Sequence, residues 1–434
     1  MDKMADVLGR AGAWCGQNKY LSAIKNAFQN FMPLTIAGAI GVLWCNVLVN
    51  DQTGLGLFFK PIMALDFLNP AFQAVNFCTI SCITVGITLG IAQEIGVWNM
   101  GAEKAGYIPG LVGLAAWLSV TNTSHMVEGA KEAFTGIAGN ELGATGLFTG
   151  MIIGVLSVEL FCFFEKQDAL KIKMPEQVPP GVARAFEVLV PATITLIITA
   201  CIGSACYNLT GLYLNDVIKN GIQGPLGAVG ATIPGVMIIY LVIMLFWLVG
   251  IHGNNMLSAV KEALFTPLAL ENVEKFNKGE KPTNIINMYA LQMWGEFGGS
   301  GVTIGLVIAI MIFGKREDNK AIASLSLVPG LFNINETVTF GVPMVLNPIL
   351  GIPFVFACLV TILVGYVLTV IGFCPVACLT VPWTTPPIVF GFLATGANVM
   401  GAVTQAILIV VSTVIYTPFL ISYEKYQNKQ AAEA

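Results

Sequence analysis

The stretch AIASLSLVPGLFNINETVTFGVP, residues 321–343, is apolar on both sides of the polar NINE. Its first apolar run, 321–332, has about 12 residues, whereas a helix needs about 20 to cross a bilayer. Non-helical backbone at membrane depth is tolerated only where it is buried in protein or lines a watery cavity. The stretch therefore predicts a re-entrant hairpin, 321–340, with its tip near Pro329 and Gly330.

The whole chain has the composition of a membrane protein. Of its 434 residues, 56% are hydrophobic and 11% are charged, against about 25% charged in an ordinary soluble domain. This predicts an all-α polytopic membrane protein of about ten transmembrane helices plus two re-entrant hairpins, organised as a two-domain transporter. The formal net charge is −4 and the basic residues form no single patch, so nucleic-acid binding has no support.

Clusters of polar residues divide the chain into its predicted parts. A stretch rich in lysine and proline separates the spans of the first half from those of the second. Basic residues favour the cytoplasmic side, which predicts that this connector and both termini are cytoplasmic. The parts are an amphipathic N-terminal helix (1–31), a first transmembrane domain (32–164), the connector (165–184), a substrate-binding domain (185–420) and a tail (421–434).

A second broken segment lies at 377–396, where VPWTTPP interrupts an apolar run. Proline removes a backbone donor and ends or kinks a helix, so we expect a second re-entrant hairpin with its tip near Pro386 and Pro387. In transporters, broken segments of this kind form the substrate site. Both hairpins are therefore candidates for binding a solute.

Glu336 is the only charged residue between Lys320 and Glu424. A carboxylate at the bilayer centre costs roughly 2.5 to 3.5 kcal/mol on the most lenient scale, so it requires a partner or a cavity. The alternative is that NINE is an aqueous loop and the acid is merely solvated. The apolar flanks favour a functional acid, with Asn335 beside it as a further candidate ligand.

GIHGNN, residues 250–255, follows a long apolar helix and contains one of only two histidines in the chain. Its glycines let a ligand approach the backbone closely, while His252 and Asn254 supply donors and acceptors. A structural histidine that caps a helix end is the alternative. The glycine frame and the paired asparagines favour a binding role.

Trp383, among the threonines and prolines of the second hairpin, offers an aromatic face. Trp247 and Trp294 are weaker candidates, because tryptophan in membrane proteins commonly marks the interface with water. Amides, one imidazole, one carboxylate and aromatic rings are the groups that recognise neutral polyols. Intramembrane arginine and lysine are scarce, which argues against an anionic solute and predicts a sugar.

No metal or cofactor is expected. Two cysteine pairs, at 78 and 82 and at 374 and 378, have the spacing of one helix face but no matching histidine or carboxylate, so we interpret them as small core residues. The chain has no G-x-x-x-x-G-K-[ST] stretch for nucleotide binding. An ion gradient or a separate protein must therefore supply the energy for transport.

Four stretches together carry a resemblance to a known family. They are IKNAFQNFMPLTIAGAIG, GIHGNN, NINETVTFGVPMVLNPILGIPF and VPWTTPPIVFGFLATG. The chain resembles the enzyme IIC membrane components of the bacterial phosphotransferase system, of the lactose, cellobiose and diacetylchitobiose type. The likeness covers almost the whole chain, and the three stretches of the second half are specific in combination.

The resemblance implies a homodimer in the bacterial cytoplasmic membrane, with the dimer contact in the first half and the sugar in the second. It implies that a phosphocysteine on a partner enzyme IIB phosphorylates the C6 hydroxyl of the sugar. Glu336 then matches the family's acid and His252 its histidine. No IIB domain follows the last predicted span, so we expect a separate IIB subunit and a disaccharide such as diacetylchitobiose or cellobiose.

Two other functions fit the same residues. In an ion-coupled sugar symporter, Glu336 would be the protonation or sodium site and no chemistry would occur. A membrane-bound transferase with a lipid-linked donor is the third possibility. Transport assays separate the three.

Overall fold

The computed structural model describes residues 10, 13–14, 17–51, 55–125, 134–175 and 177–433. The chain forms two compact units, which share no simple boundary in the sequence. Unit 1 includes Ala39–Ala74 and Val229–Ala434, and unit 2 consists of Gln17–Gly38 and Val75–Ala228. Residues 1–9, 11–12 and 15–16 of the predicted amphipathic helix lie outside the described residues.

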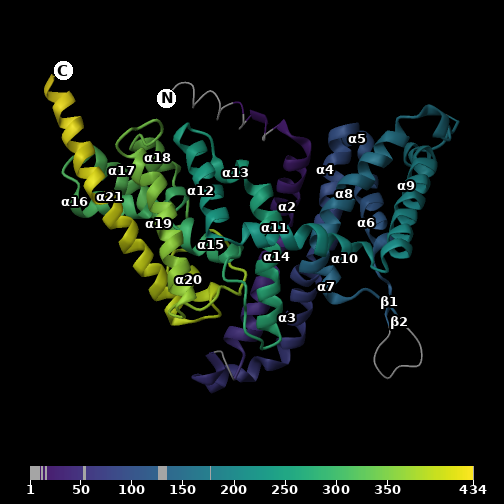
Figure 1. The fold of residues 1–434 in the computed structure, drawn as a ribbon, viewed down its shortest axis with the longest axis horizontal. Helices are drawn as coiled ribbons and strands as arrows, with labels where there is room; N and C mark the ends of the chain where they lie inside the picture. Colours follow the sequence, from purple (N-terminus) through teal and green to yellow (C-terminus); the bar gives the residue numbers. More distant parts are fainter. Residues whose placement is uncertain are drawn as a thin grey trace. The chain divides into compact units, whose positions relative to one another are not determined.

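Unit 2 is a helical bundle in which α4, α6 and α8 lie side by side, with α9 against α6 and α8 (Figure 1). Its helices are α2 (Lys19–Leu43), which continues into unit 1, η4 (Phe77–Ser81), α4 (Ile83–Met100), α5 (Ala102–Ala105), α6 (Ile108–Val120), α7 (Gly139–Leu142), α8 (Ala144–Glu165), η5 (Asp168–Leu170), α9 (Pro180–Thr210), α10 (Leu214–Ile218), η6 (Lys219–Gln223) and α11 (Gly224–Gly230). A short antiparallel pair, β1 (Ser124–His125) and β2 (Phe134–Thr135), joins Ser124 to Thr135.

Small residues allow the central helices of unit 2 to pack closely. A Cβ at Gly113 of α6 would overlap Ala92 of α4, and one at Gly150 of α8 would overlap Thr88 of α4. Close approach through glycine, alanine and threonine is how membrane helices gain packing contacts when lipid is as apolar as the side chains. The bundle therefore has the packing expected of helices in a bilayer.

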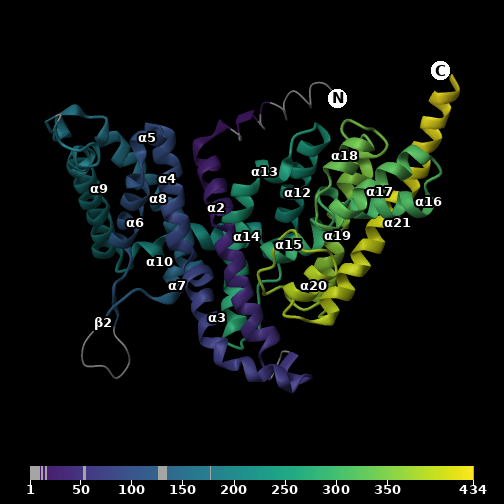
Figure 2. The same cartoon turned by 180° about the vertical axis from the view of Figure 1, so that it is seen from behind.

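Unit 1 contains the long helix α21, which packs against α16, α19 and α20 (Figure 2). Its helices are η1 (Trp44–Leu48), η2 (Leu55–Leu57), η3 (Lys60–Leu68), α3 (Asn69–Asn76), which ends in unit 2, α12 (Ile233–Leu248), α13 (Gly253–Met256), α14 (Ser258–Asn277), α15 (Met288–Gly295), η7 (Ser300–Val302), α16 (Ile304–Phe313), α17 (Glu317–Leu331), α18 (Glu336–Gly341), α19 (Gly351–Val370), α20 (Val389–Ala394) and α21 (Val399–Glu433).

The predicted class, an all-α polytopic membrane protein, is confirmed. Within the described residues, five helices are long and apolar enough to cross a membrane, or seven if each of two bent helix pairs is one span. One bent pair consists of Met288–Val302 and Ile304–Phe313, with a bend of 59°. Two shorter apolar helices, α6 and α12, add to these spans.

Both segments predicted as re-entrant hairpins are broken in the structure. In the first, α17 ends at Leu331 and α18 begins at Glu336 after a non-helical turn. The predicted tip near Pro329 and Gly330 is wrong, because both residues lie inside α17. In the second, residues 371–388 form no helix between α19 and α20. Helices α2 and α21 are also longer than expected: α2 crosses the predicted boundary at 31 and 32 without a break, and α21 continues through the predicted tail to Glu433.

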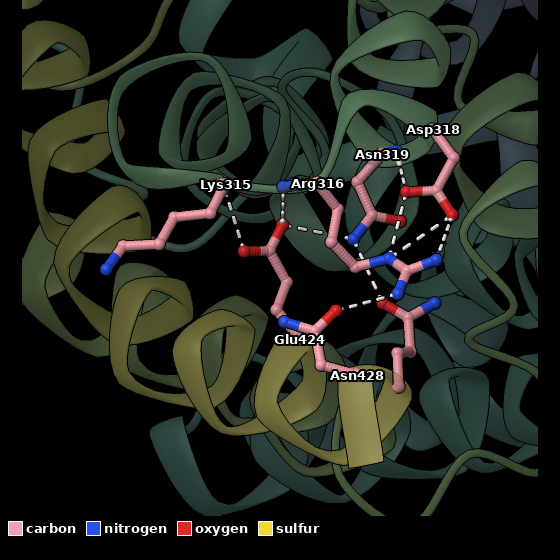
Figure 3. A network of polar contacts seen from close by, with 7 residues as sticks. Lys315, Arg316, Asp318, Asn319, Glu424 and Asn428 are labelled. Atoms are coloured by element: carbon pink, nitrogen blue, oxygen red, sulfur yellow. Dashed lines mark hydrogen bonds and ion pairs between the residues drawn. The ribbon is translucent and has the colours of Figure 1, made fainter. Parts of the chain in front are cut away.

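A buried carboxylate ties the start of α17 to the end of α21 (Figure 3). Glu424, 4% exposed, accepts hydrogen bonds from the backbone N–H of Lys315 at 2.8 Å and of Arg316 at 3.3 Å, and from Asn319 Nδ2 at 3.1 Å. The Arg316 guanidinium bonds Asp318 at 2.6 Å and Asn428 at 2.8 Å. Glu424 therefore satisfies backbone donors that precede α17, which no helix can satisfy by itself.

Replacing Glu424 by alanine is expected to lower the thermal unfolding temperature of the purified protein. Each buried donor left without an acceptor costs about 1 to 3 kcal/mol. Glu424→Gln keeps one acceptor oxygen, so its loss should be smaller. Equal unfolding temperatures for the wild type and Glu424→Ala would contradict this role.

Candidate sugar-binding site

His252 lies in the break between α12 and α13, both in unit 1. Thr232 caps the start of α12 by accepting from Gly235 N at 3.2 Å. The helix ends at Leu248, and the chain turns at Gly250 with a φ of +80°, which favours glycine. This turn places His252 at the N-cap of α13, directly before its first residue, Gly253.

The hydrogen bonding of His252 sets its tautomer. Its Nδ1 accepts from Asn255 N at 3.3 Å, which caps α13. A neutral imidazole with Nδ1 as acceptor carries its proton on Nε2. Nε2 faces the Oε1 of Glu336 at 3.9 Å, and the two side chains are 40% and 47% exposed. The separation is too long for a direct hydrogen bond, so both groups can still bind a ligand.

Ser300 connects the two segments that carry this pair. Asn254 Nδ2, two residues after His252, donates to Ser300 Oγ at 2.9 Å. Asn335 Nδ2, beside Glu336, donates to the Ser300 carbonyl at 2.8 Å. The structure therefore uses these amide donors of Asn254 and Asn335 within the protein, and it brings together the two motifs that the sequence analysis singled out.

A buried ion pair lies next to this framework. Lys261 of α14 pairs with Glu296, and its Nζ also donates to Asn254 Oδ1 at 3.4 Å. Tyr240 of α12 donates to Glu296 Oε1 at 2.7 Å. The side chains of Lys261 and Glu296 are only 6% and 17% exposed. Sequence reasoning did not identify Lys261, because its partner Glu296 lies 35 residues away in the chain.

The three tryptophans proposed as sugar contacts have different environments. The ring of Trp247 lies against that of His252, with centroids 4.5 Å apart. Trp247 and Trp294 are 2% and 1% exposed, and the indole N–H of each has no hydrogen-bond partner. Trp383 is 45% exposed. Only Trp383 therefore presents a large open surface in this conformation.

The loop that carries Trp383 is held at two points by side-chain amides. Asn333, three residues before Glu336, donates through Nδ2 to the carbonyls of Trp383 and Thr385. Gln405 of α21 accepts from Ile388 N at 2.7 Å and from Gly391 N at 2.8 Å. Asn333 and Gln405 were not among the predicted site residues, because the backbone groups that they bind are distant from them in the sequence. In the described part of the chain, no three histidine, cysteine or acidic side chains gather to hold a metal ion.

Comparison with known proteins agrees with this architecture. Residues 25–358 match the family model described as phosphotransferase system, EIIC. The oligo-beta-mannoside-specific EIIC component of Bacillus subtilis (strain 168) is 33% identical, over 98% of this chain and 94% of that protein. The cellobiose-specific EIIC component of Lactococcus lactis subsp. lactis (strain IL1403) is 29% identical, over 98% of both.

A crystal structure has the same fold. The transporter ChbC, the IIC component of the N,N'-diacetylchitobiose-specific phosphotransferase system, superposes with a TM-score of 0.88 at 29% identity, over 97% of each chain. The fold is that of a polytopic membrane transporter. The chain belongs to the EIIC family of the phosphotransferase system, which confirms the resemblance inferred from its motifs.

Lys261→Met or Glu296→Leu alone is expected to lower the thermal unfolding temperature, because each leaves an uncompensated buried charge that costs about 3 to 5 kcal/mol. The double variant removes both charges and should be closer to the wild type than either single variant. Unfolding of the purified proteins in detergent measures all three. Losses that simply add in the double variant would show that the two residues are not energetically coupled.

Proposed function

We propose that this protein is the sugar-translocating subunit of a phosphotransferase system that takes up a disaccharide such as cellobiose or diacetylchitobiose. Family membership and the solutes in the names of the relatives support this sugar class. We further propose that it is a homodimer in the bacterial cytoplasmic membrane with both termini in the cytoplasm. A separate enzyme IIB would supply the phosphoryl group.

The facing pair of His252 Nε2 and Glu336 Oε1, 3.9 Å apart, is the observation that carries this proposal. A hydroxyl oxygen beside both atoms can accept from Nε2–H and donate its own proton to the carboxylate. Neither group can do both, because the imidazole offers only a donor here and the carboxylate only acceptors. The pair is therefore complementary to one sugar hydroxyl.

Phosphoryl transfer requires little of the protein beyond positioning and charge stabilisation. We assign Glu336 the task of orienting the C6 hydroxyl and accepting its proton. The oxygen then attacks the phosphorus of the IIB phosphocysteine, an O–P bond forms, the S–P bond breaks, and the cysteine leaves as thiolate. His252 holds the hydroxyl through its Nε2–H, and Trp383 packs against a sugar ring.

An ion-coupled symporter is the main alternative, because an exposed intramembrane acid could also carry a proton or sodium. Uptake by membrane vesicles distinguishes the two functions. The phosphotransferase function predicts that sugar phosphate accumulates only with the soluble phosphoryl-transfer proteins and IIB, and that accumulation survives a protonophore. Free sugar inside the vesicles, lost on adding the protonophore, would establish the symporter.

Glu336→Gln is expected to lower the rate of sugar phosphorylation by roughly 10²- to 10⁴-fold, the usual contribution of a general base. The amide keeps the shape of the side chain but accepts no proton, so sugar binding should change far less than the rate. Glu274→Gln is the matched control, since Glu274 is an exposed acid of the same unit that pairs with Lys278. Normal phosphorylation by Glu336→Gln would remove this residue from the mechanism.

A further inference from the structure

Asn333 occupies the turn between α17 and α18, three residues before Glu336. Its φ is +63°, a left-handed conformation that asparagine adopts more readily than most residues other than glycine. Its own N–H donates to Gly330 O at 3.0 Å, which closes the turn. Because the backbone closes the turn, the side chain of Asn333 is available to contact other segments of unit 1.

The side-chain amide of Asn333 reaches two segments distant in the sequence. Its Oδ1 accepts from Gly298 N at 2.6 Å, in the loop between α15 and α16. Its Nδ2 donates to the carbonyl of Thr385 at 3.1 Å and to that of Trp383. All three partners are backbone groups in non-helical chain, where no helix supplies their hydrogen bonds.

The arrangement connects the acid to the aromatic ring through one residue. Asn333 lies in the turn directly before Glu336, the first residue of α18, and its Nδ2 donates to the carbonyl of Trp383. Gln405 holds the far end of the Trp383 loop through Ile388 N, where Ile388 has a strained φ of +75°. Without Asn333, the loop would keep its anchor at Ile388 and lose the one beside Trp383.

We propose that Asn333 is a positioning residue for the sugar: it holds Trp383 in register with Glu336 and touches no substrate. This inference rests on the proposed function, in which Trp383 packs against a sugar ring and Glu336 binds a hydroxyl. Replacing Asn333 should therefore weaken sugar binding only through its effect on the position of Trp383. Two substitutions test the hydrogen bonds of the side chain while they keep the backbone conformation.

Asn333→Asp keeps the acceptor for Gly298 and tolerates the positive φ, but it places oxygen against the carbonyls of Trp383 and Thr385. Asn333→Gly keeps the backbone conformation and removes all three bonds. Calorimetry with cellobiose and diacetylchitobiose on the purified full chain should give a Kd raised about tenfold in both variants, with unchanged stoichiometry. A reduced number of competent sites at unchanged Kd would mean a purely structural role and would overturn the proposal.

A double-mutant cycle tests the route through Trp383. In the Trp383→Ala background, Asn333→Asp should change the Kd by less than about twofold. Independent, additive losses would overturn the positioning role. The matched control is Asn319→Asp, which removes two donors from the Glu424 network of the same unit: it should lower the unfolding temperature and leave the Kd unchanged.

A second readout needs no sugar. The fluorescence of Trp383 is obtained by subtracting the emission spectrum of the Trp383→Phe variant from that of the same protein with Trp383. Asn333→Asp should shift this difference spectrum relative to the wild type and change its quenching by acrylamide. An unchanged spectrum and unchanged quenching would overturn the proposal. If the wild type binds neither disaccharide, the proposed sugar class is wrong. The fluorescence result still shows whether Asn333 positions Trp383.

Discussion

Backbone that leaves the helix loses its helical hydrogen bonds, and in unit 1 side chains of the protein replace many of them. Side-chain amides supply many of these bonds. The nitrogens of Asn272 and Asn287 both donate to the carbonyl of Ala377, at 3.0 and 3.1 Å. Asn333 and Gln405 continue the same arrangement along the loop that follows. A primary amide suits this task because it offers donors and acceptors without a charge to desolvate.

The same bonds leave free the two groups that we propose to bind the sugar hydroxyl. Because Ser300 binds the amides of Asn254 and Asn335, those residues serve the framework, while the neighbouring His252 and Glu336 remain partly exposed and unbonded to each other. The buried Lys261–Glu296 pair adds rigidity beside them without adding net charge. A fixed framework around an open donor and acceptor is what positioning a nucleophile requires.

Much of this architecture could be predicted from the sequence. The breaks at 321–340 and 377–396 followed from segment length and proline, and Glu336 stood out because its surroundings lack charge. The contacts of Asn333 could not be predicted, since its partners at Gly298 and Trp383 are 35 and 50 residues away and any of several asparagines could have made them. The length of α21 was also missed, because its polar last turns continue a helix that hydropathy ends near 420.

We propose that Glu336 and His252 together hold one primary hydroxyl of a disaccharide. The decisive measurement is a structure of the protein with cellobiose or diacetylchitobiose bound. We expect the 6-hydroxyl oxygen within hydrogen-bond distance, about 2.5 to 3.2 Å, of both Glu336 and His252 Nε2. A bound sugar whose primary hydroxyl lies away from the carboxylate, with Glu336 and His252 bonded to other groups, would contradict it.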